Sequence, residues 1–354
     1  MILLALAANV CLFGASPVSA APDLKWTDLS ASIPTTILDK TSDYPMLSFA
    51  SSRGTEWLVG NPNQLFQVTS KGKIFDLTPD LKKSGFQKIR QVASDGQTWL
   101  VIGDSGPWFT QPDLAFRFDG MYWKNVSPVM AALPPQEWLG QVTGKRGLWI
   151  LPTNRSLYVW HSDLKEIVNV SLPGELIRDG FSRMEFHPLA QGWLARVDSP
   201  NVTRYYLFDG QDFTDAGQRL GVMNNTTAIG SDGGRALVMT AINENKRWGI
   251  RAVLFNGNSA RRLDASFRNF VDRARNEIRF FPEASVVWDG KSWLMADRSR
   301  HLAIYDGRQP ATMLPPTRDT FVVTAYGLNG QSLRAGFARD KTNRLVPRLV
   351  LTQE

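Results

Sequence analysis

The sequence predicts an all-β protein, a seven-bladed β-propeller made of four-stranded antiparallel blades. Three observations support this prediction. A Gly-containing turn followed by an apolar run recurs along the chain, and a second turn of a different type follows it within the repeats. The last repeat lacks one strand, which the start of the chain can supply. Short alternating apolar runs are common, whereas helical periodicity is scarce.

The stretch between residues 89 and 128 shows one repeat in full. Its four apolar runs are Ile89–Ala93, Trp99–Ile102, Leu114–Phe118 and Tyr122–Val126. Asp95-Gly96 separates the first two runs, and Asp119-Gly120 separates the last two. An Asp-Gly pair between alternating apolar residues predicts a type I′ hairpin turn, in which both central residues have positive φ. We therefore expect this unit to form one blade.

The turn between the first and second strands can be found seven times. Its copies are Arg53–Leu58, Asp95–Leu100, Arg146–Ile150, Gln191–Ala195, Asp232–Leu237, Asp289–Leu294 and Asn329–Arg334. The turn between the third and fourth strands recurs at Ser70–Phe75, Phe118–Trp123, Phe208–Phe213, Phe255–Ala260 and Tyr305–Pro310. In the third repeat His161-Ser162-Asp163 takes its place. A spacing of about 40 to 57 residues is typical of four-stranded blades.

The two ends of the chain predict how the ring closes. The seventh repeat begins at Phe321, and Arg344–Thr352 is its third strand. Its fourth strand is expected from Lys25–Pro34, which resembles the fourth strands of other repeats. Such a closure removes the exposed sheet edge that an open array would leave. Pro347 lies inside the third strand, so a bulge or a shifted strand boundary is expected there.

The second strand of each repeat carries a large apolar residue at about the same register. These residues are Trp57, Trp99, Trp149, Trp193, Leu237, Trp293 and Leu333. Aromatic side chains favour half-buried sheet positions, so we expect these residues to pack between blades rather than to bind a ligand.

The beginning of the chain has the pattern of an export signal. Residues 1–21 carry no charge and end in small residues around Val18-Ser19-Ala20, which predicts a cleaved signal peptide. An uncleaved N-terminal anchor is the alternative. Residues 22–354 are then a single domain, secreted or extracytoplasmic (periplasm or cell surface), without a further transmembrane span. Cys11 is the only cysteine, so no disulfide is expected.

The formal net charge of +7 favours anionic partners, such as acidic glycans or envelope polymers. Basic stripes typical of nucleic-acid binding are absent from the sequence, and export argues against a nucleic-acid ligand. The three histidines, His161, His187 and His301, fall in different repeats, so no metal site is expected. No cofactor motif occurs either, and we expect a monomer.

Two short motifs resemble known propeller families. Ser94-Asp95-Gly96-Gln97-Thr98-Trp99 resembles the Asp-box of sialidase-like propellers, although it is shorter and falls at a different turn. Gly233-Gly234 is similar to the glycine doublet of kelch repeats. The resemblance implies the propeller architecture over the mature chain and transfers no functional residue.

The resemblance also implies an alternative function, a sialidase-like glycoside hydrolase with its site at the central channel. Propeller glycosidases carry acids and arginines on their innermost strands, with arginines that clamp a carboxylate and a Tyr–Glu pair as nucleophile. The residues available here for such a site are Arg90, Arg183, Glu185, Arg279 and Tyr326. The Arg-Ile-Pro signature of sialidases is missing, and polar residues can line a wet channel without any catalytic role.

The main functional hypothesis is a secreted or envelope-associated binding module. Loops between second and third strands emerge on one face of a propeller, and here they contain aromatic and cationic residues. Those expected to bind the ligand are Trp108, Phe109, Arg155, Lys246, Arg247, Trp248, Arg298, Arg300 and His301. Exposed aromatic rings beside arginines are typical of recognition sites for an anionic extracellular glycan or protein. Two alternatives stay open: a solvated loop rim without function, and a structural module in a larger envelope assembly.

Overall fold

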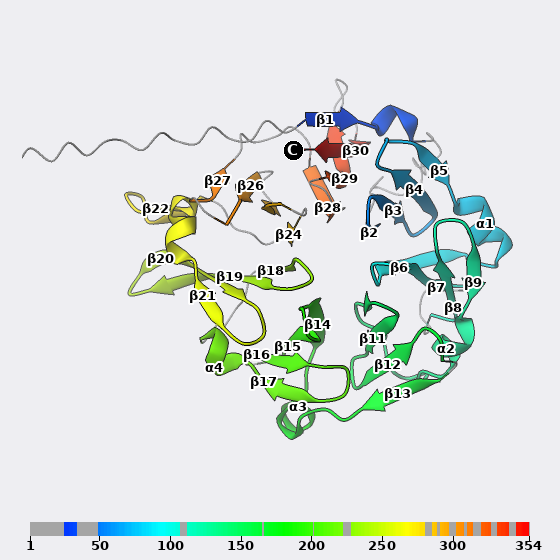
Figure 1. Ribbon diagram of the computed structural model, residues 1–354, viewed down its shortest axis with the longest axis horizontal. Helices are drawn as coiled ribbons and strands as arrows, with labels where there is room; N and C mark the ends of the chain where they lie inside the picture. Colours follow the sequence, from blue (N-terminus) through cyan, green and yellow to red (C-terminus); the bar gives the residue numbers. More distant parts are fainter. Residues whose placement is uncertain are drawn as a thin grey trace, which may run out of the picture.

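The computed structural model describes residues 25–33, 49–106, 112–164, 166–200, 202–221, 228–279, 285–288, 291–296, 302–307, 310–313, 320–326, 331–339 and 345–353. These residues include seven four-stranded antiparallel sheets, which stand like blades around a common centre (Figure 1). The predicted seven-bladed β-propeller is therefore confirmed.

The first four blades follow one another along the chain. Blade 1 contains β2 (Phe49–Arg53), β3 (Glu56–Asn61), β4 (Gln64–Thr69) and β5 (Ile74–Asp76). Blade 2 contains β6 (Lys88–Ser94), β7 (Trp99–Asp104), β8 (Leu114–Phe118) and β9 (Trp123–Asn125). Blade 3 contains β10 (Thr143–Lys145), β11 (Leu148–Pro152), β12 (Leu157–His161) and β13 (Ile167–Val170). Blade 4 contains β14 (Arg183–Pro188), β15 (Trp193–Asp198), β16 (Thr203–Phe208) and β17 (Phe213–Asp215).

The last three blades complete the ring. Blade 5 contains β18 (Ala228–Ser231), β19 (Ala236–Glu244), β20 (Arg247–Phe255) and β21 (Ala260–Arg262). Blade 6 contains β24 (Ser285–Trp288), β25 (Trp293–Ala296), β26 (Leu302–Tyr305) and β27 (Thr312–Met313). Blade 7 contains β28 (Thr320–Tyr326), β29 (Gln331–Arg339), β30 (Leu345–Gln353) and β1 (Lys25–Asp28). The first strands of neighbouring blades contact each other around the centre, and β28 of blade 7 contacts β2 of blade 1.

Short helices follow the fourth strands where the chain passes to the next blade. They are α1 (Thr78–Lys83), α2 (Ser127–Ala131), α3 (Gly174–Asp179), α4 (Gly217–Leu220) and the 3₁₀ helices η1 (Ser30–Ser32) and η3 (Asp264–Phe270). Their apolar residues, such as Leu81, Leu176 and Leu220, are buried between blades. None of the helices in the described ranges is long and apolar enough to cross a membrane.

The hydrophobic core lies in the seams between blades. Trp99 of blade 2 packs against Leu58 and Leu65 of blade 1, and Trp149 of blade 3 packs in a cluster with residues of blade 2. Successive residues of a strand point to opposite faces, so each second strand contributes side chains to two seams. All seven apolar residues predicted to pack between blades are buried, with at most 3% exposure. That prediction is confirmed.

The Asp-Gly turns differ from the predicted type I′ geometry. Gly96 has a φ of 88° and Gly120 a φ of 101°, but the aspartates before them do not have positive φ. Instead, Asp119 Oδ1 accepts hydrogen bonds from the backbone N–H groups of Met121 and Tyr122, both at 2.8 Å. These bonds hold the pKa of the Asp119 carboxyl below its ordinary value. The aspartate thus acts through its carboxylate, as in Asx turns, and only the glycine needs positive φ.

Asp95 extends the same turn into a contact between blades. Its Oδ1 accepts from the backbone N–H groups of Gln97 at 2.8 Å and Thr98 at 2.6 Å. Its Oδ2 accepts from the N–H of Gly147 in blade 3 at 2.9 Å. The Asp95 residue is only 5% exposed, so this carboxylate joins blades 2 and 3 in a place that water reaches poorly.

We predict that Asp95→Ala lowers the free energy of unfolding by about 2–4 kcal/mol, because it leaves buried N–H groups without an acceptor. Asp119→Ala is the matched control, since its exposed carboxylate accepts hydrogen bonds from the backbone of its own turn. It should cost about 1 kcal/mol or less. Urea unfolding of both variants measures the difference. Equal losses in the two variants would show that the contact between blades adds nothing.

The ring closes as the sequence predicts. β1 pairs with β30 in antiparallel register, with Lys25 opposite Gln353 and Asp28 opposite Val350. Leu29 and Ile33, which follow β1, are buried against Trp57 of blade 1. Both ends of the chain therefore stabilise the same blade and the seam beside it.

Pro347 is accommodated without the bulge or boundary shift expected from the sequence. The register between β29 and β30 runs without a shift, and Pro347 lies opposite Phe337. Leu349 donates its N–H to Ser30 Oγ and accepts at its C=O from Leu29 N, so alternate residues of β30 face the β1 side. Pro347 is one of them, and β1 ends before reaching it. Its missing N–H therefore points away from β29, and no ladder bond is lost.

The closure can be locked covalently. The backbone groups of Thr352 face β29, so Trp26 and Thr352 form a non-hydrogen-bonded pair, whose Cα atoms lie about 4.5 Å apart. In a Cys11→Ser background, we predict that the double variant Trp26→Cys and Thr352→Cys forms an intramolecular disulfide. Oxidation should stabilise the protein by about 2–4 kcal/mol. Thermal melts of oxidised and reduced samples test this, and an oxidised sample that melts no higher than the reduced one would contradict the closed ring.

Candidate binding site on the blade 5 extension

Blade 5 carries a longer hairpin than the blades before it. The second and third strands of blades 1 to 4 have five or six residues, whereas β19 and β20 have nine each. Asn245 and Lys246 form its turn, with φ of 52° and 61°. Two consecutive positive φ values are those of a type I′ turn, which matches the twist of the strands. The tip projects to the left rim of the ring in Figure 1.

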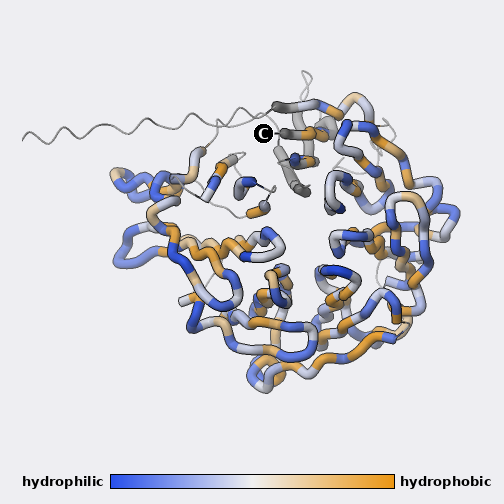
Figure 2. Tube along the Cα trace, in the orientation of Figure 1, coloured by the Kyte–Doolittle hydropathy of each residue, from blue (hydrophilic) through white to orange (hydrophobic). Residues whose placement is uncertain are grey.

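A second hairpin, β22 (Val271–Asp272) and β23 (Glu277–Ile278), is inserted after η3 and before blade 6. Asn276 in its turn fastens it to the first hairpin. Asn276 Oδ1 accepts from the N–H of Trp248 at 2.9 Å, and its Nδ2 donates to the C=O of Lys246 at 2.7 Å. We call residues 244–251 together with 264–279 the blade 5 extension. Both of its tips are hydrophilic in Figure 2.

The blade 5 extension holds more cations than its own carboxylates neutralise. Its sequence has seven Lys or Arg residues against four Asp or Glu residues. Glu244 pairs with Arg251 at 2.9 Å, and Asp272 pairs with Arg279 at 2.6 Å. The hydrogen bond and charge of Arg279 hold the pKa of Asp272 below its ordinary value, so this carboxylate is ionised at neutral pH.

The other cations of the blade 5 extension form no ion pair with any residue that the structure describes. They are Lys246, Arg247, Arg268, Arg273 and Arg275, and all five are exposed. An arginine without a carboxylate partner keeps its five N–H donors available for a ligand.

Two cavities lie on the blade 5 extension and share Arg268, Val271 and Arg273 in their walls. One has a volume of about 440 Å³ and is also lined by Trp248, which is 39% exposed. The other has a volume of about 600 Å³ and reaches Arg279 and the outer strand of blade 6. Each wall also contains one carboxylate, Asp264 in the first cavity and Asp272 in the second, and each of them pairs with an arginine. The apolar walls and the remaining guanidinium groups suit a chain that carries both carboxylates and apolar side chains.

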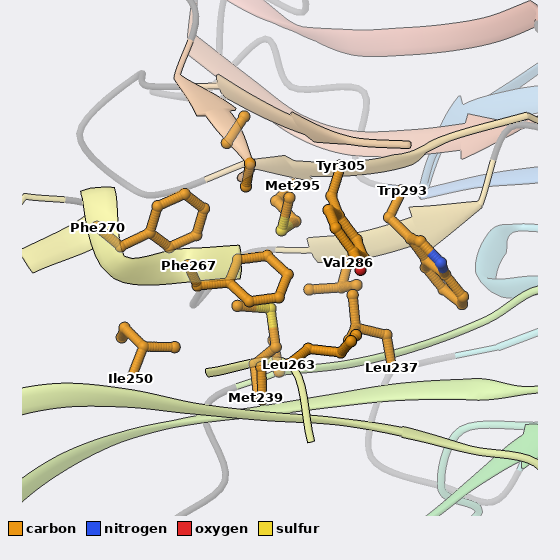
Figure 3. Close-up of a cluster of buried hydrophobic side chains, with 14 of the residues drawn as sticks. Leu237, Met239, Ile250, Leu263, Phe267, Phe270, Val286, Trp293, Met295 and Tyr305 are labelled. Atoms are coloured by element: carbon orange, nitrogen blue, oxygen red, sulfur yellow. The ribbon is translucent and has the colours of Figure 1, made fainter. Parts of the chain in front are cut away.

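The base of these cavities is fixed by the core of the seam between blades 5 and 6. Phe267 and Phe270 of η3 are fully buried and pack against each other with ring centroids 5.3 Å apart (Figure 3). Phe267 also lies 5.1 Å from the ring of Tyr305 in blade 6. Arg268 stands between these two anchors, so its backbone is held in place while its side chain faces solvent.

The structure brings together only some of the residues predicted to bind a ligand. Lys246, Arg247 and Trp248 lie on the blade 5 extension, whereas Arg155 lies in the loop between β11 and β12 of blade 3. Trp108, Phe109, Arg298, Arg300 and His301 lie outside the described residues. The sequence-based prediction missed Arg268, Arg273 and Arg275, because they belong to a connection between blades. The available signal was the density of arginines between residues 247 and 279.

The residues of the alternative catalytic site do not assemble as that hypothesis requires. Arg90 on β6 pairs with the buried Asp104 of its own blade at 2.8 Å. Arg183 and Arg196 of blade 4 both pair with Glu185, with Arg196 Nη1 at 3.5 Å from Glu185 Oε2. These arginines are therefore committed to carboxylates of their own blades rather than to an open clamp.

Arg279 is a correction to the sequence-based prediction, which placed it on an innermost strand. It directly follows β23, pairs with Asp272, and lies outside the ring of first strands, where β24 holds the blade 6 position. The inserted hairpin explains the error, because the chain has not yet returned to the centre at residue 279. Tyr326 ends β28 in blade 7, across the ring from β14, which carries Glu185 (Figure 1).

Glu185 is partly buried, and two opposing effects act on its carboxyl. Burial raises its pKa, but His187, Arg183 and Arg196 lower it by more, so the pKa lies below the ordinary value. The group is ionised at neutral pH and is not a general acid there. Since the folded-state pKa is depressed, the ionised Glu185 carboxylate stabilises the protein at pH values above its unfolded-state pKa. This stability is lost as the pH falls through the folded-state pKa.

We predict that Glu185→Gln destabilises the protein at pH 7, because it leaves Arg183 and Arg196 without their shared carboxylate. The difference from the unsubstituted protein should shrink as the pH falls below about 4. Urea unfolding across this pH range measures it. A difference that grows on acidification would mean that the pKa of Glu185 is raised, as a general acid requires.

Comparison with known proteins adds information on the fold. No protein-family model matches the sequence, and no curated protein matches it. Among solved structures, YCF48 from Cyanidioschyzon merolae is similar with a TM-score of 0.57 and 12% identity, over 93% of this chain and 98% of that one. YCF48 bound to D1 peptide has a TM-score of 0.53 and 13% identity, over 94% and 96% of the two chains. The Pan2 WD40 domain of Neurospora crassa has a TM-score of 0.51 and 10% identity, over 93% and 95%.

These similarities define the class of the protein. At such low identities they show a shared architecture, and the chain is a β-propeller by both its sheet order and its structural neighbours.

Proposed function

We propose that the protein is an exported binding module that holds an acidic protein segment on the blade 5 extension. One observation carries the proposal: the blade 5 extension holds five exposed cations without carboxylate partners among the described residues, and two of them, Arg268 and Arg273, line both cavities. Asn276 fastens the two hairpins of the extension together. The uncharged leader with Val18-Ser19-Ala20 supports a periplasmic or cell-surface location, and we expect the protein to act as a monomer.

The chemistry of the blade 5 extension favours carboxylates next to an apolar side chain. Guanidinium groups bind carboxylates through two parallel hydrogen bonds, and such charge-assisted bonds are stronger than neutral ones. Trp248 offers an exposed ring at the edge of one cavity, where an aromatic or aliphatic side chain can be buried. The backbone of both tips is fixed before the partner arrives, so less entropy is lost on binding.

A protein partner is favoured over a soluble metabolite by the shape of the site. The two cavities share a wall and extend along the inserted hairpin from Trp248 to Met313, which suits an extended chain. YCF48, a propeller of similar architecture, has been solved bound to D1 peptide. That complex supports the idea that a propeller of this kind can bind a peptide.

The test uses a Glu-rich peptide that contains one Tyr. We predict that the triple variant Arg268→Gln, Arg273→Gln and Arg275→Gln binds it at least about tenfold more weakly at physiological salt. The matched control is the triple variant Lys71→Gln, Lys83→Gln and Lys124→Gln, which removes the same charge from exposed sites in blades 1 and 2. Its affinity should change by no more than about twofold.

Isothermal titration calorimetry gives both affinities, and melting temperatures confirm that all variants fold. Equal weakening of both triple variants would mean that only the net charge attracts the peptide. Undiminished binding by the arginine variant would place the site elsewhere on the molecule.

A further inference from the structure

Trp138 is a second exposed tryptophan, distant from the blade 5 extension. It lies in the connection between blades 2 and 3 and is 74% exposed, against 39% for Trp248. Most of its surface therefore faces water, so its apolar indole gains little from burial in the folded protein. A single exposed apolar residue can be accidental, so the surroundings of Trp138 decide whether it belongs to a site.

The backbone around Trp138 is fastened to the loop between β11 and β12. Trp138 donates its N–H to Asn154 Oδ1 at 2.7 Å, and Asn154 returns its own N–H to the C=O of Trp138 at 3.0 Å. Gly140 donates to the C=O of Pro152 at 2.7 Å, and Leu139 bridges to Thr153. The connection thus forms a short ladder with blade 3, and the indole projects from a fixed backbone.

The buried carboxylate of Glu137 stabilises the blade 3 loop that forms this ladder. Glu137, which is 6% exposed, accepts hydrogen bonds from Thr153 Oγ1 at 2.6 Å, Ser156 Oγ at 3.0 Å and the Tyr158 hydroxyl at 3.4 Å. Burying a carboxylate is costly unless such donors surround it. Thr153 and Ser156 lie in the same loop as Asn154, and Tyr158 lies on the strand that follows it. These hydrogen bonds therefore fix the backbone that carries Trp138.

The segments next to Trp138 carry several exposed polar residues. The exposed residues beside it in the connection and across the ladder are Pro135, Gln136, Gly140, Gln141, Asn154 and Arg155. A hot spot for a protein partner is normally enclosed by contacts that exclude water. Here the neighbouring exposed residues include the amide side chains of Gln136, Gln141 and Asn154 and the guanidinium of Arg155, and these donors suit the hydroxyls and carboxylates of a sugar.

We propose that Trp138 is a stacking platform for one pyranose ring of an acidic polysaccharide, with Arg155 binding the carboxylate of a uronic acid. The apolar C–H face of a pyranose packs flat on an indole, and the guanidinium donates two parallel hydrogen bonds to the carboxylate. This site is independent of the blade 5 extension, because blades 3 and 5 lie on different sides of the ring with blade 4 between them (Figure 1).

The experiment measures binding of a short polygalacturonate oligosaccharide to the full chain by saturation-transfer NMR and calorimetry. Trp138→Ala should weaken binding at least about tenfold. Tyr122→Ala is the matched control, since it removes an aromatic side chain that is 70% exposed in blade 2 and belongs to neither site, and it should leave the affinity within about twofold. Arg155→Gln should weaken binding of the uronate oligosaccharide and leave binding of a neutral galactose oligosaccharide unchanged. Melting temperatures of the three variants should stay within a few degrees of the unsubstituted protein.

Three results would overturn the proposal. The first is the absence of saturation transfer to either oligosaccharide. The second is unchanged uronate binding by Trp138→Ala, and the third is equal weakening by Tyr122→Ala and Trp138→Ala. None of these results bears on the acidic peptide, whose binding is measured with the arginine variants, so the two proposals fail separately.

Discussion

The pairing of β1 with β30 is the constraint on which the rest of the structure depends. The core of this protein lies in the seams between blades rather than inside any one sheet, so every blade needs a neighbour on both faces. An open row of blades would leave two apolar faces and one sheet edge in water. The N-terminal strand removes the edge, and Leu29 and Ile33 fill the last seam.

A closed ring stabilised at its seams leaves the connecting loops free to differ. Blades 1 to 4 are followed by short connections with one helix each, while the connection after blade 5 adds a hairpin to its helix. The inserted hairpin is held by Phe267 and Phe270 in the seam and by Asn276 at the tip. Both proposed sites lie in such regions, where a rigid scaffold positions loop residues for recognition.

Carboxylates have several structural roles here, and most of them stabilise the fold. The charges that they neutralise can be distinguished from the cations that are left for a ligand. Asp95 and Glu137 are buried and accept hydrogen bonds that hold loops and neighbouring blades. Glu185 and Asp104 neutralise arginines near the centre. The cations of the blade 5 extension are different, because too few carboxylates lie near them. A surplus of unpaired arginine is what makes that surface a candidate for an anionic partner.

The sequence by itself determined the ring. The features that define it are local patterns, which alternating apolar residues and turn residues reveal directly. They are the seven turn repeats, the register of Trp57 and its counterparts, and the strand missing from the last repeat. The sequence-based predictions for the Asp-Gly turns, Pro347 and Arg279 were wrong. The turns depend on a side-chain acceptor, Pro347 on the direction of its backbone nitrogen, and Arg279 on an inserted hairpin, and all three depend on neighbouring segments. Tertiary structure alone decided which cations remain unpaired and that Trp138 stands exposed, since both depend on segments that meet only in the folded chain.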